Sequence, residues 1–136
     1  MTPFGAAMKM LTLHKSREVF AESTSVNIGG NKLGVLATKD DRGLAIQLWN
    51  LQLKDPRPAT AEVVVANLPE PLRTSKLRVR RYQIDSKHSN CFAAPDAPGG
   101  LEVVEDTRQE GGTELRFSTR LEPTALCLWV IEKSAD

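Results

Sequence analysis

From Glu18 onward, apolar and polar residues alternate with a period of two, which is typical of strands with one buried and one solvated face. The alternation is clearest over residues 114–121, where Leu115 and Phe117 lie between charged or polar neighbours. The pattern predicts eight strands: Val19–Ser23, Leu33–Thr38, Leu44–Leu51, Ala61–Leu68, Lys76–Asp85, Leu101–Asp106, Thr113–Leu121 and Ala125–Glu132. Segments rich in Gly, Pro, Asn and Asp separate them. We therefore expect an all-β fold, an antiparallel β-sandwich of about eight strands, with a closed barrel as the main alternative.

Two of the predicted strands are apolar on both faces. Leu44–Leu51 has few polar positions, and Ala125 to Ile131 is almost continuously apolar. We expect both to be central strands that the second sheet covers on one side. The N-terminal helix, or a domain outside this chain, would cover their other side.

The N-terminal segment has the pattern of a short α-helix. Thr2 suits the N-cap and Pro3 the first helical position, and the spacing predicts a helix from about Pro3 to Leu13. One apolar stripe comprises Phe4, Ala7, Met8 and Leu11. A second comprises Ala6, Met10 and Leu13. A terminal helix normally exposes a polar face to solvent. The second stripe is therefore either ordinary surface, since scattered exposed apolar residues are common, or a candidate interdomain face.

Length and charge exclude several classes of function. A chain of 136 residues fits one domain and is too short for a (β/α)₈ barrel, which needs about 250. The net charge of +1 does not favour nucleic acid or an anionic membrane surface. The first 16 residues lack the features of a signal peptide, which favours a cytoplasmic location but leaves the location open, because a signal could lie outside this chain.

No cofactor or metal motif is present in the sequence, and we expect neither. His14, His88, Cys91 and Cys127 show no ligand spacing. The two cysteines are expected to be reduced and unpaired, because small disulfide-dependent domains usually carry more. The pair Gly29-Gly30 lacks the lysine of a phosphate-binding loop.

The candidate chemical groups have simpler structural explanations. The acidic residues fall on a solvated strand face, at a strand end or in a hairpin arm: Glu114, Glu122, Glu102, Glu105 and Asp106. Ser89 follows His88 but lacks a nucleophile elbow, and adjacent side chains point apart.

Four aromatic residues could form a sugar-stacking platform: Trp49, Trp129, Tyr82 and Phe92. The two tryptophans lie in the most apolar strands, where core or domain-interface packing is the expected role. Arg81 continues the inward row of Leu77, so it needs a carboxylate or carbonyl partner, and Asp85 is a candidate.

The stretch Arg80-Arg81-Tyr82-Gln83-Ile84-Asp85-Ser86-Lys87-His88-Ser89-Asn90 resembles a signature of family 39 of the glycoside hydrolases, the β-xylosidase and α-L-iduronidase family. In that family a similar strand leads into an Asp-x-x-His-Ser-Asn loop of a C-terminal β-sandwich. Residues 3–11 resemble the last helix of the preceding barrel, and residues 34–50 resemble the first paired strands. After Asn90 the chain departs from the family pattern, because Cys91-Phe92 leads quickly to Gly99-Gly100.

The resemblance implies a domain that assists an enzyme. Residues 1–16 would correspond to the last helix of a missing catalytic barrel, and residues 17–136 to the β-sandwich. Catalysis in the family depends on two glutamates of the barrel, one of them preceded by asparagine, and this sequence contains no Asn-Glu pair. No catalytic residue is therefore carried over. The implied interdomain loop consists of Arg81, Asp85, His88, Ser89 and Asn90.

The expected function is a non-catalytic accessory domain of a β-xylosidase-like retaining glycosidase in carbohydrate metabolism. Its expected partner is the catalytic barrel, carbohydrate is a second candidate partner, and exposed apolar surface could also drive self-association. The alternatives are an independent carbohydrate-binding module and, more remotely, a small hydrolase with an unrecognised site.

Overall fold

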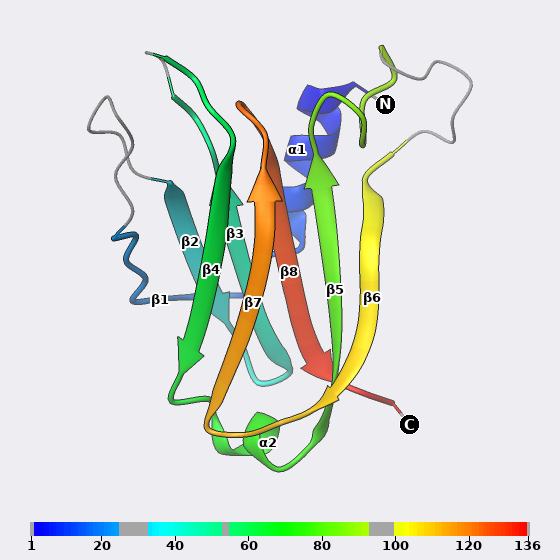
Figure 1. Ribbon diagram of the computed structural model, residues 1–136. Helices are drawn as coiled ribbons and strands as arrows, with labels where there is room; N and C mark the ends of the chain where they lie inside the picture. Colours follow the sequence, from blue (N-terminus) through cyan, green and yellow to red (C-terminus); the bar gives the residue numbers. More distant parts are fainter. Residues whose placement is uncertain (1, 25–32, 53–54, 93–99, 136) are drawn as a thin grey trace.

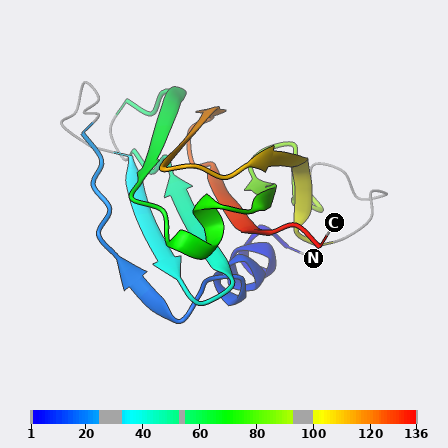
Figure 2. The same ribbon diagram turned by 90° about the horizontal axis from the view of Figure 1, so that it is seen from below.

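Two antiparallel sheets and an N-terminal helix form the molecule (Figures 1 and 2). The computed structural model describes residues 2–24, 33–52, 55–92 and 100–135. The elements in chain order are α1 (Pro3–Thr12), β1 (Arg17–Val19), β2 (Gly34–Lys39), β3 (Gly43–Trp49), β4 (Ala59–Ala66), α2 (Glu70–Arg73), β5 (Lys76–Ile84), β6 (Glu102–Glu110), β7 (Glu114–Leu121) and β8 (Leu126–Lys133). Six strands form a large sheet in the order β1-β2-β3-β8-β5-β6, and β4 and β7 form a small one. The predicted fold class, an antiparallel β-sandwich with one N-terminal helix, is confirmed.

The two strands predicted to be central are central. β3 and β8 lie in the middle of the large sheet, and most of their residues are buried. Alternate residues of β8 enter two different cores. Cys127, Trp129 and Ile131 face the small sheet, whereas Leu128 and Val130 face α1. The large sheet is thus covered on both sides, by β4–β7 on one and by α1 on the other (Figure 2).

The helix α1 packs with the face opposite to the one expected. Thr2 caps it as predicted, since its Oγ1 accepts a hydrogen bond from the Gly5 N–H at 3.1 Å. Ala6 and Met10, proposed from the sequence as interdomain residues, are fully buried against the chain's own sheet, and Leu13 packs beside them. Two large members of the other stripe, Phe4 and Met8, are exposed. Periodicity defines two apolar faces but does not decide which one contacts the sheet. The small Ala6 allows close approach of the helix, and the flexible Met10 fills the space beside it.

The other differences lie at the ends of elements and in one short helix. Only Val19 of the strand predicted at Val19–Ser23 is paired, and Phe20 is 89% exposed. β6 extends to Glu110, four residues further than predicted, because an edge strand needs no apolar alternation. The helix α2 forms where two prolines, Pro69 and Pro71, predicted a turn. Proline is tolerated in the first turn of a helix, and the buried Leu72 anchors this one.

Candidate functional site

The loop that follows β5 carries most of the candidate residues identified from the sequence. It starts at Asp85, where β5 ends, and it lies at the end of the sandwich beside the start of α1 (Figure 1). Ile84 at the end of β5 belongs to the same buried cluster as Ala6, which holds the loop near the helix. The structure therefore brings the predicted interdomain loop and α1 to one region of the surface.

The carboxylate of Asp85 organises the first half of this loop. Its Oδ1 accepts hydrogen bonds from the main-chain N–H groups of Lys87 (2.8 Å) and His88 (2.7 Å). The Nδ1–H of the His88 ring donates to the same oxygen at 2.9 Å. Gln83 Nε2 donates to the other carboxylate oxygen, Oδ2, at 2.8 Å. An aspartate that bonds the main chain two and three residues ahead is a typical turn-forming residue.

The same contacts keep Asp85 ionised. Burial alone would raise the pKa of this carboxyl group, because it disfavours the charged form. The hydrogen bonds from Gln83, from the two main-chain N–H groups and from the His88 ring outweigh burial, so the pKa of Asp85 is lowered. Asp85 is therefore suited to hold a turn as a carboxylate and not to donate a proton.

Ser89 and Asn90 complete the loop by bonding the main chain. The Ser89 hydroxyl donates to the carbonyl oxygen of Gln83 at 2.6 Å and accepts from the Glu102 N–H at 2.8 Å. The carboxylate of Glu102 in turn accepts from the Ser89 N–H. Asn90 Nδ2 donates to the carbonyl oxygen of Asp85 at 3.4 Å. Ser89 is 3% exposed, and its hydroxyl both donates a hydrogen bond to the main chain and accepts one from it. It is therefore not available as a nucleophile.

The partner predicted for Arg81 is not the one that the structure shows. Its Nε donates to Glu105 on β6 at 3.2 Å, and its guanidinium also contacts Gln83, which links it indirectly to Asp85. The expectation that Arg81 needs an acidic partner is confirmed, but Asp85 as that partner is wrong. Glu105 lies directly opposite Arg81 on β6, just before a shift in register between Arg81 and Tyr82, and a single sequence does not reveal which residues of two strands are paired.

Among the five candidate loop residues, His88 has a partly exposed side chain. Its side chain is 39% exposed, and Nδ1 is bound to Asp85. With the proton held on Nδ1, the neutral ring presents Nε2 as an acceptor. An Asp–His pair of this kind orients an imidazole, but the adjacent Ser89 is committed to the main chain. The arrangement can provide an oriented hydrogen-bonding group, and it lacks a nucleophile.

Several acidic residues elsewhere are paired with arginines. Asp106 lies 2.6 Å from Arg78, and this ion pair holds the pKa of the Asp106 carboxyl below its usual value. Glu114 and Glu122 pair with arginines two residues away in sequence. Nothing in these surroundings resembles the desolvated pair of carboxyl groups that a glycosidase uses. Within residues 2–24, 33–52, 55–92 and 100–135, no group of three His, Cys, Asp or Glu side chains could hold a metal ion.

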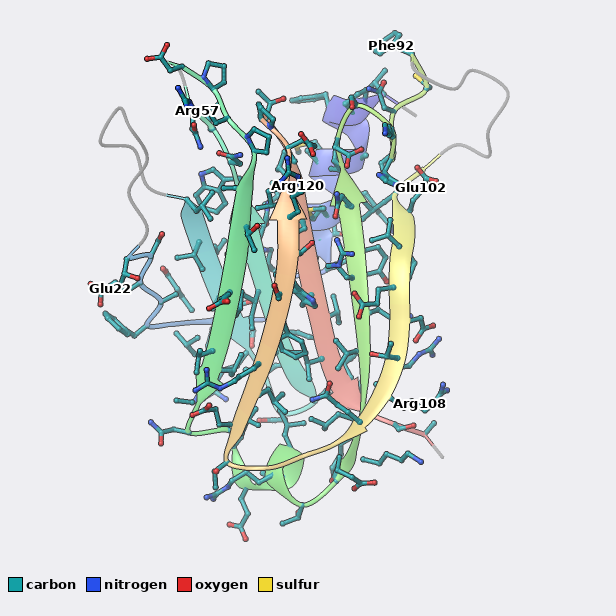
Figure 3. The ribbon with its side chains drawn as sticks, in the orientation of Figure 1. Glu22, Arg57, Phe92, Glu102, Arg108 and Arg120 are labelled. Carbon is teal, nitrogen blue, oxygen red and sulfur yellow. The ribbon has the colours of Figure 1, made fainter. Side chains whose placement is uncertain are left out.

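The aromatic residues do not form a platform. Trp129 is buried and stacks on Phe117 with 5.7 Å between the ring centroids. Tyr82 packs against the core beneath α1. Of the four aromatic residues singled out from the sequence, only Phe92 is strongly exposed, at 76%, and it projects from the tip of the loop (Figure 3). A single ring does not favour a sugar-stacking surface.

Two contributors to the loop escaped the sequence analysis. Gln83 and Glu102 are polar residues in strands, and each looks like an ordinary solvated position. The spacing of two between Arg81, Gln83 and Asp85 was the available signal, because it places all three on one face of β5. Glu102 had no such signal, since its role depends on contact with Ser89 across 13 residues of chain.

Comparison with solved structures identifies the fold. The chain resembles the GH39 enzyme from Xanthomonas axonopodis pv. citri (TM-score 0.70, 12% identity), with 94% of this chain and 29% of that chain covered. It also resembles a monomeric beta-xylosidase from Caulobacter crescentus CB15 (TM-score 0.69, 14% identity, 95% and 30% covered). A third similar structure is a glucosidase from Croceicoccus marinus (TM-score 0.66, 15% identity, 98% and 32% covered). The resemblance expected from the loop signature is therefore confirmed at the level of the fold.

The chain spans about a third of the length of the solved enzymes that it matches. No protein-family model matches the sequence, and no curated protein is similar to it. None of the helices in the described part of the chain is long and apolar enough to cross a membrane.

Proposed function

We propose that this chain acts as a non-catalytic accessory domain of a β-xylosidase-like glycoside hydrolase, where it packs against the catalytic barrel and supports it. One observation carries the proposal: almost the whole chain matches a portion of solved glycosidase chains that are about three times longer. The loop signature of residues 80–90 supports the same relation.

The absence of an Asn-Glu pair agrees with a supporting role. In the glycosidase family that the loop resembles, an acid/base glutamate follows asparagine on the barrel, and this sequence has no such pair. The carboxylates described above are bound by arginines or by main-chain N–H groups. They are accounted for as parts of the fold.

The surface that would meet the barrel combines α1 and the loop after β5. Three large apolar side chains of α1, Phe4, Met8 and Leu11, are at least half exposed. In the loop, Asp85 fixes the main chain while His88 and Phe92 remain accessible. Side chains of this kind, apolar with a few oriented polar groups, are typical of the contact between two domains of one enzyme.

The proposal is tested by the coding DNA next to the codon for Met1 and by an activity assay. We expect a barrel with two catalytic glutamates to be encoded in frame or in the adjacent gene. We also expect the purified chain to leave aryl xylosides unhydrolysed. Hydrolysis by the chain that a single alanine substitution within it abolishes would overturn the proposal.

A further inference from the structure

A cleft of about 920 Å³ opens along one side of the sandwich, between the two sheets. Its floor is the inner face of β2 and β3, and one wall is β4. The other wall is the segment that follows β1, residues 20–24, which carries the labelled Glu22 in Figure 3. The floor is apolar, with Val35, Ala37 and Leu48 among its residues.

The cleft exists because the two sheets differ in width. Among the residues that the structure describes, the small sheet contains β4 and β7, and it faces a sheet of six strands. No strand of the described residues pairs with the outer edge of β4, on the side toward residues 20–24 (Figure 1). Five apolar side chains near this edge are only partly buried: Leu33, Val35, Ala37, Val63 and Val65. The described residues therefore cover this side of the hydrophobic core incompletely.

Apart from the charged Glu62, the outer edge of β4, as far as the structure describes it, has few of the features that usually prevent pairing. Exposed edges are normally blunted by proline, lysine or a bulge. β4 reads Ala-Thr-Ala-Glu-Val-Val-Val-Ala, and its register with β7 runs without interruption from Ala59 to Ala66. Its main-chain N–H and C=O groups on the cleft side are therefore presented in the regular spacing that another strand complements.

We propose that this cleft binds one extended peptide segment of another polypeptide, which adds to β4 as a third strand of the small sheet. The shape favours a single strand, because the cleft has a wall on each side and the edge of a second sheet would meet residues 20–24. Strand addition is an established way of recognising peptides, in which main-chain hydrogen bonds give affinity and alternate side chains give specificity. The inference concerns a surface away from α1 and does not depend on the proposed role beside a barrel.

The side chains around β4 specify the peptide. Its inward residues would lie over Val35 and Ala37, so they should be apolar and small to medium in size. On the outward face, Glu62 lies opposite Ser118 of β7, and the nearby Arg116 and Arg120 are paired with other glutamates. Glu62 makes no ion pair with any residue that the structure describes. A lysine or arginine in the outward row of the peptide would complement it.

The test uses a fluorescein-labelled peptide of about seven residues, a typical strand length, with valine alternating with threonine and lysine. We expect saturable binding by fluorescence anisotropy. The same peptide with N-methyl groups at alternate residues should not bind, because it cannot complete the main-chain hydrogen bonds. Glu62→Lys should weaken binding of the lysine peptide about fivefold to tenfold, and a glutamate version of the peptide should then bind this variant better.

Glu110→Lys on β6 is the matched control, since it makes the same charge change on an exposed residue at the far edge of the large sheet. It should leave binding unchanged. The proposal is overturned if the lysine peptide shows no saturable binding, if the N-methylated peptide binds equally well, or if both variants behave alike. A dimer in sedimentation velocity that Glu62→Lys abolishes would assign the edge to a second copy of the chain and would also overturn it.

Discussion

Asp85 is the residue on which the shape of the candidate loop depends most directly. Its carboxylate accepts two main-chain N–H groups and two side-chain donors. Asp85→Ala would leave these donors without a partner, so we expect the free energy of unfolding to fall by about 2 kcal/mol. Urea denaturation at pH 7 measures this. Asp41→Ala, at a fully exposed aspartate, is the control and should change stability by less than about 0.5 kcal/mol.

The lowered pKa of Asp85 also predicts how its contribution varies with pH. A carboxyl group whose pKa is lower in the folded state stabilises the fold above its unfolded pKa, about 3.9, and loses this effect as the pH falls through the folded value. The stability difference between the wild type and Asp85→Asn should therefore be largest near neutral pH and shrink below about pH 4. A difference that stays constant down to pH 2 would contradict this assignment.

The two cysteines should differ in reactivity. Both are free, Cys127 is fully buried, and burial raises the pKa of its thiol to about 12. The thiolate is the reactive form, so Cys127 should not react with Ellman's reagent at pH 8 in the folded protein, whereas the partly exposed Cys91 should. One thiol should titrate in buffer and two in urea. Cys91→Ser, as the control, should leave none in buffer.

The bonding partner of a candidate residue could be predicted where that partner is close in sequence. It could not be predicted where the partner lies on a distant strand. The turn formed by Asp85 and His88 spans four residues, and the motif itself indicated it. The partner of Arg81 lies on another strand, and alternation along a single strand does not reveal that pairing, so it was assigned wrongly. The contact between Ser89 and Glu102 is non-local in the same way.

At the scale of elements, the helix α1 provides the sharpest test, since Met8 and Met10 lie on opposite faces. Met10 is fully buried and Met8 is 52% exposed. Met10→Ala should lower the free energy of unfolding by about 3 kcal/mol through lost burial and a residual cavity. Met8→Ala is the matched control and should change it by less than about 0.5 kcal/mol. Equal losses in urea denaturation would contradict the observed orientation of the helix.

The strands were predictable because side chains along a half-buried strand alternate between the core and solvent. β3 and β8 have apolar residues on both faces, and this property correctly indicated their central position. The helix was less predictable, because apolar residues on two faces leave its rotation undetermined. α2 was missed because its two prolines resemble a turn until Leu72 is seen to be buried.

For the whole molecule, the sequence contained enough to predict two facing sheets, and the solved glycosidases have the same architecture over nearly all of this chain. The sequence did not reveal that the strands divide into one sheet of six and one sheet of two. That division follows from which strands pair, and it creates the free edge of β4 and the cleft beside it. The candidate interdomain surface likewise became visible only once α1 was placed on the sheet.

The central claim is that residues 1–136 support a catalytic barrel. The most direct measurement compares the midpoint of thermal unfolding and kcat/KM on an aryl xyloside for the barrel that we expect to be encoded beside this chain, with and without these residues joined to it. The account predicts that the joined form is more stable and more active, and that replacing Phe4, Met8 and Leu11 together by serine removes part of the gain. A barrel whose stability and activity are the same with and without the chain would contradict it.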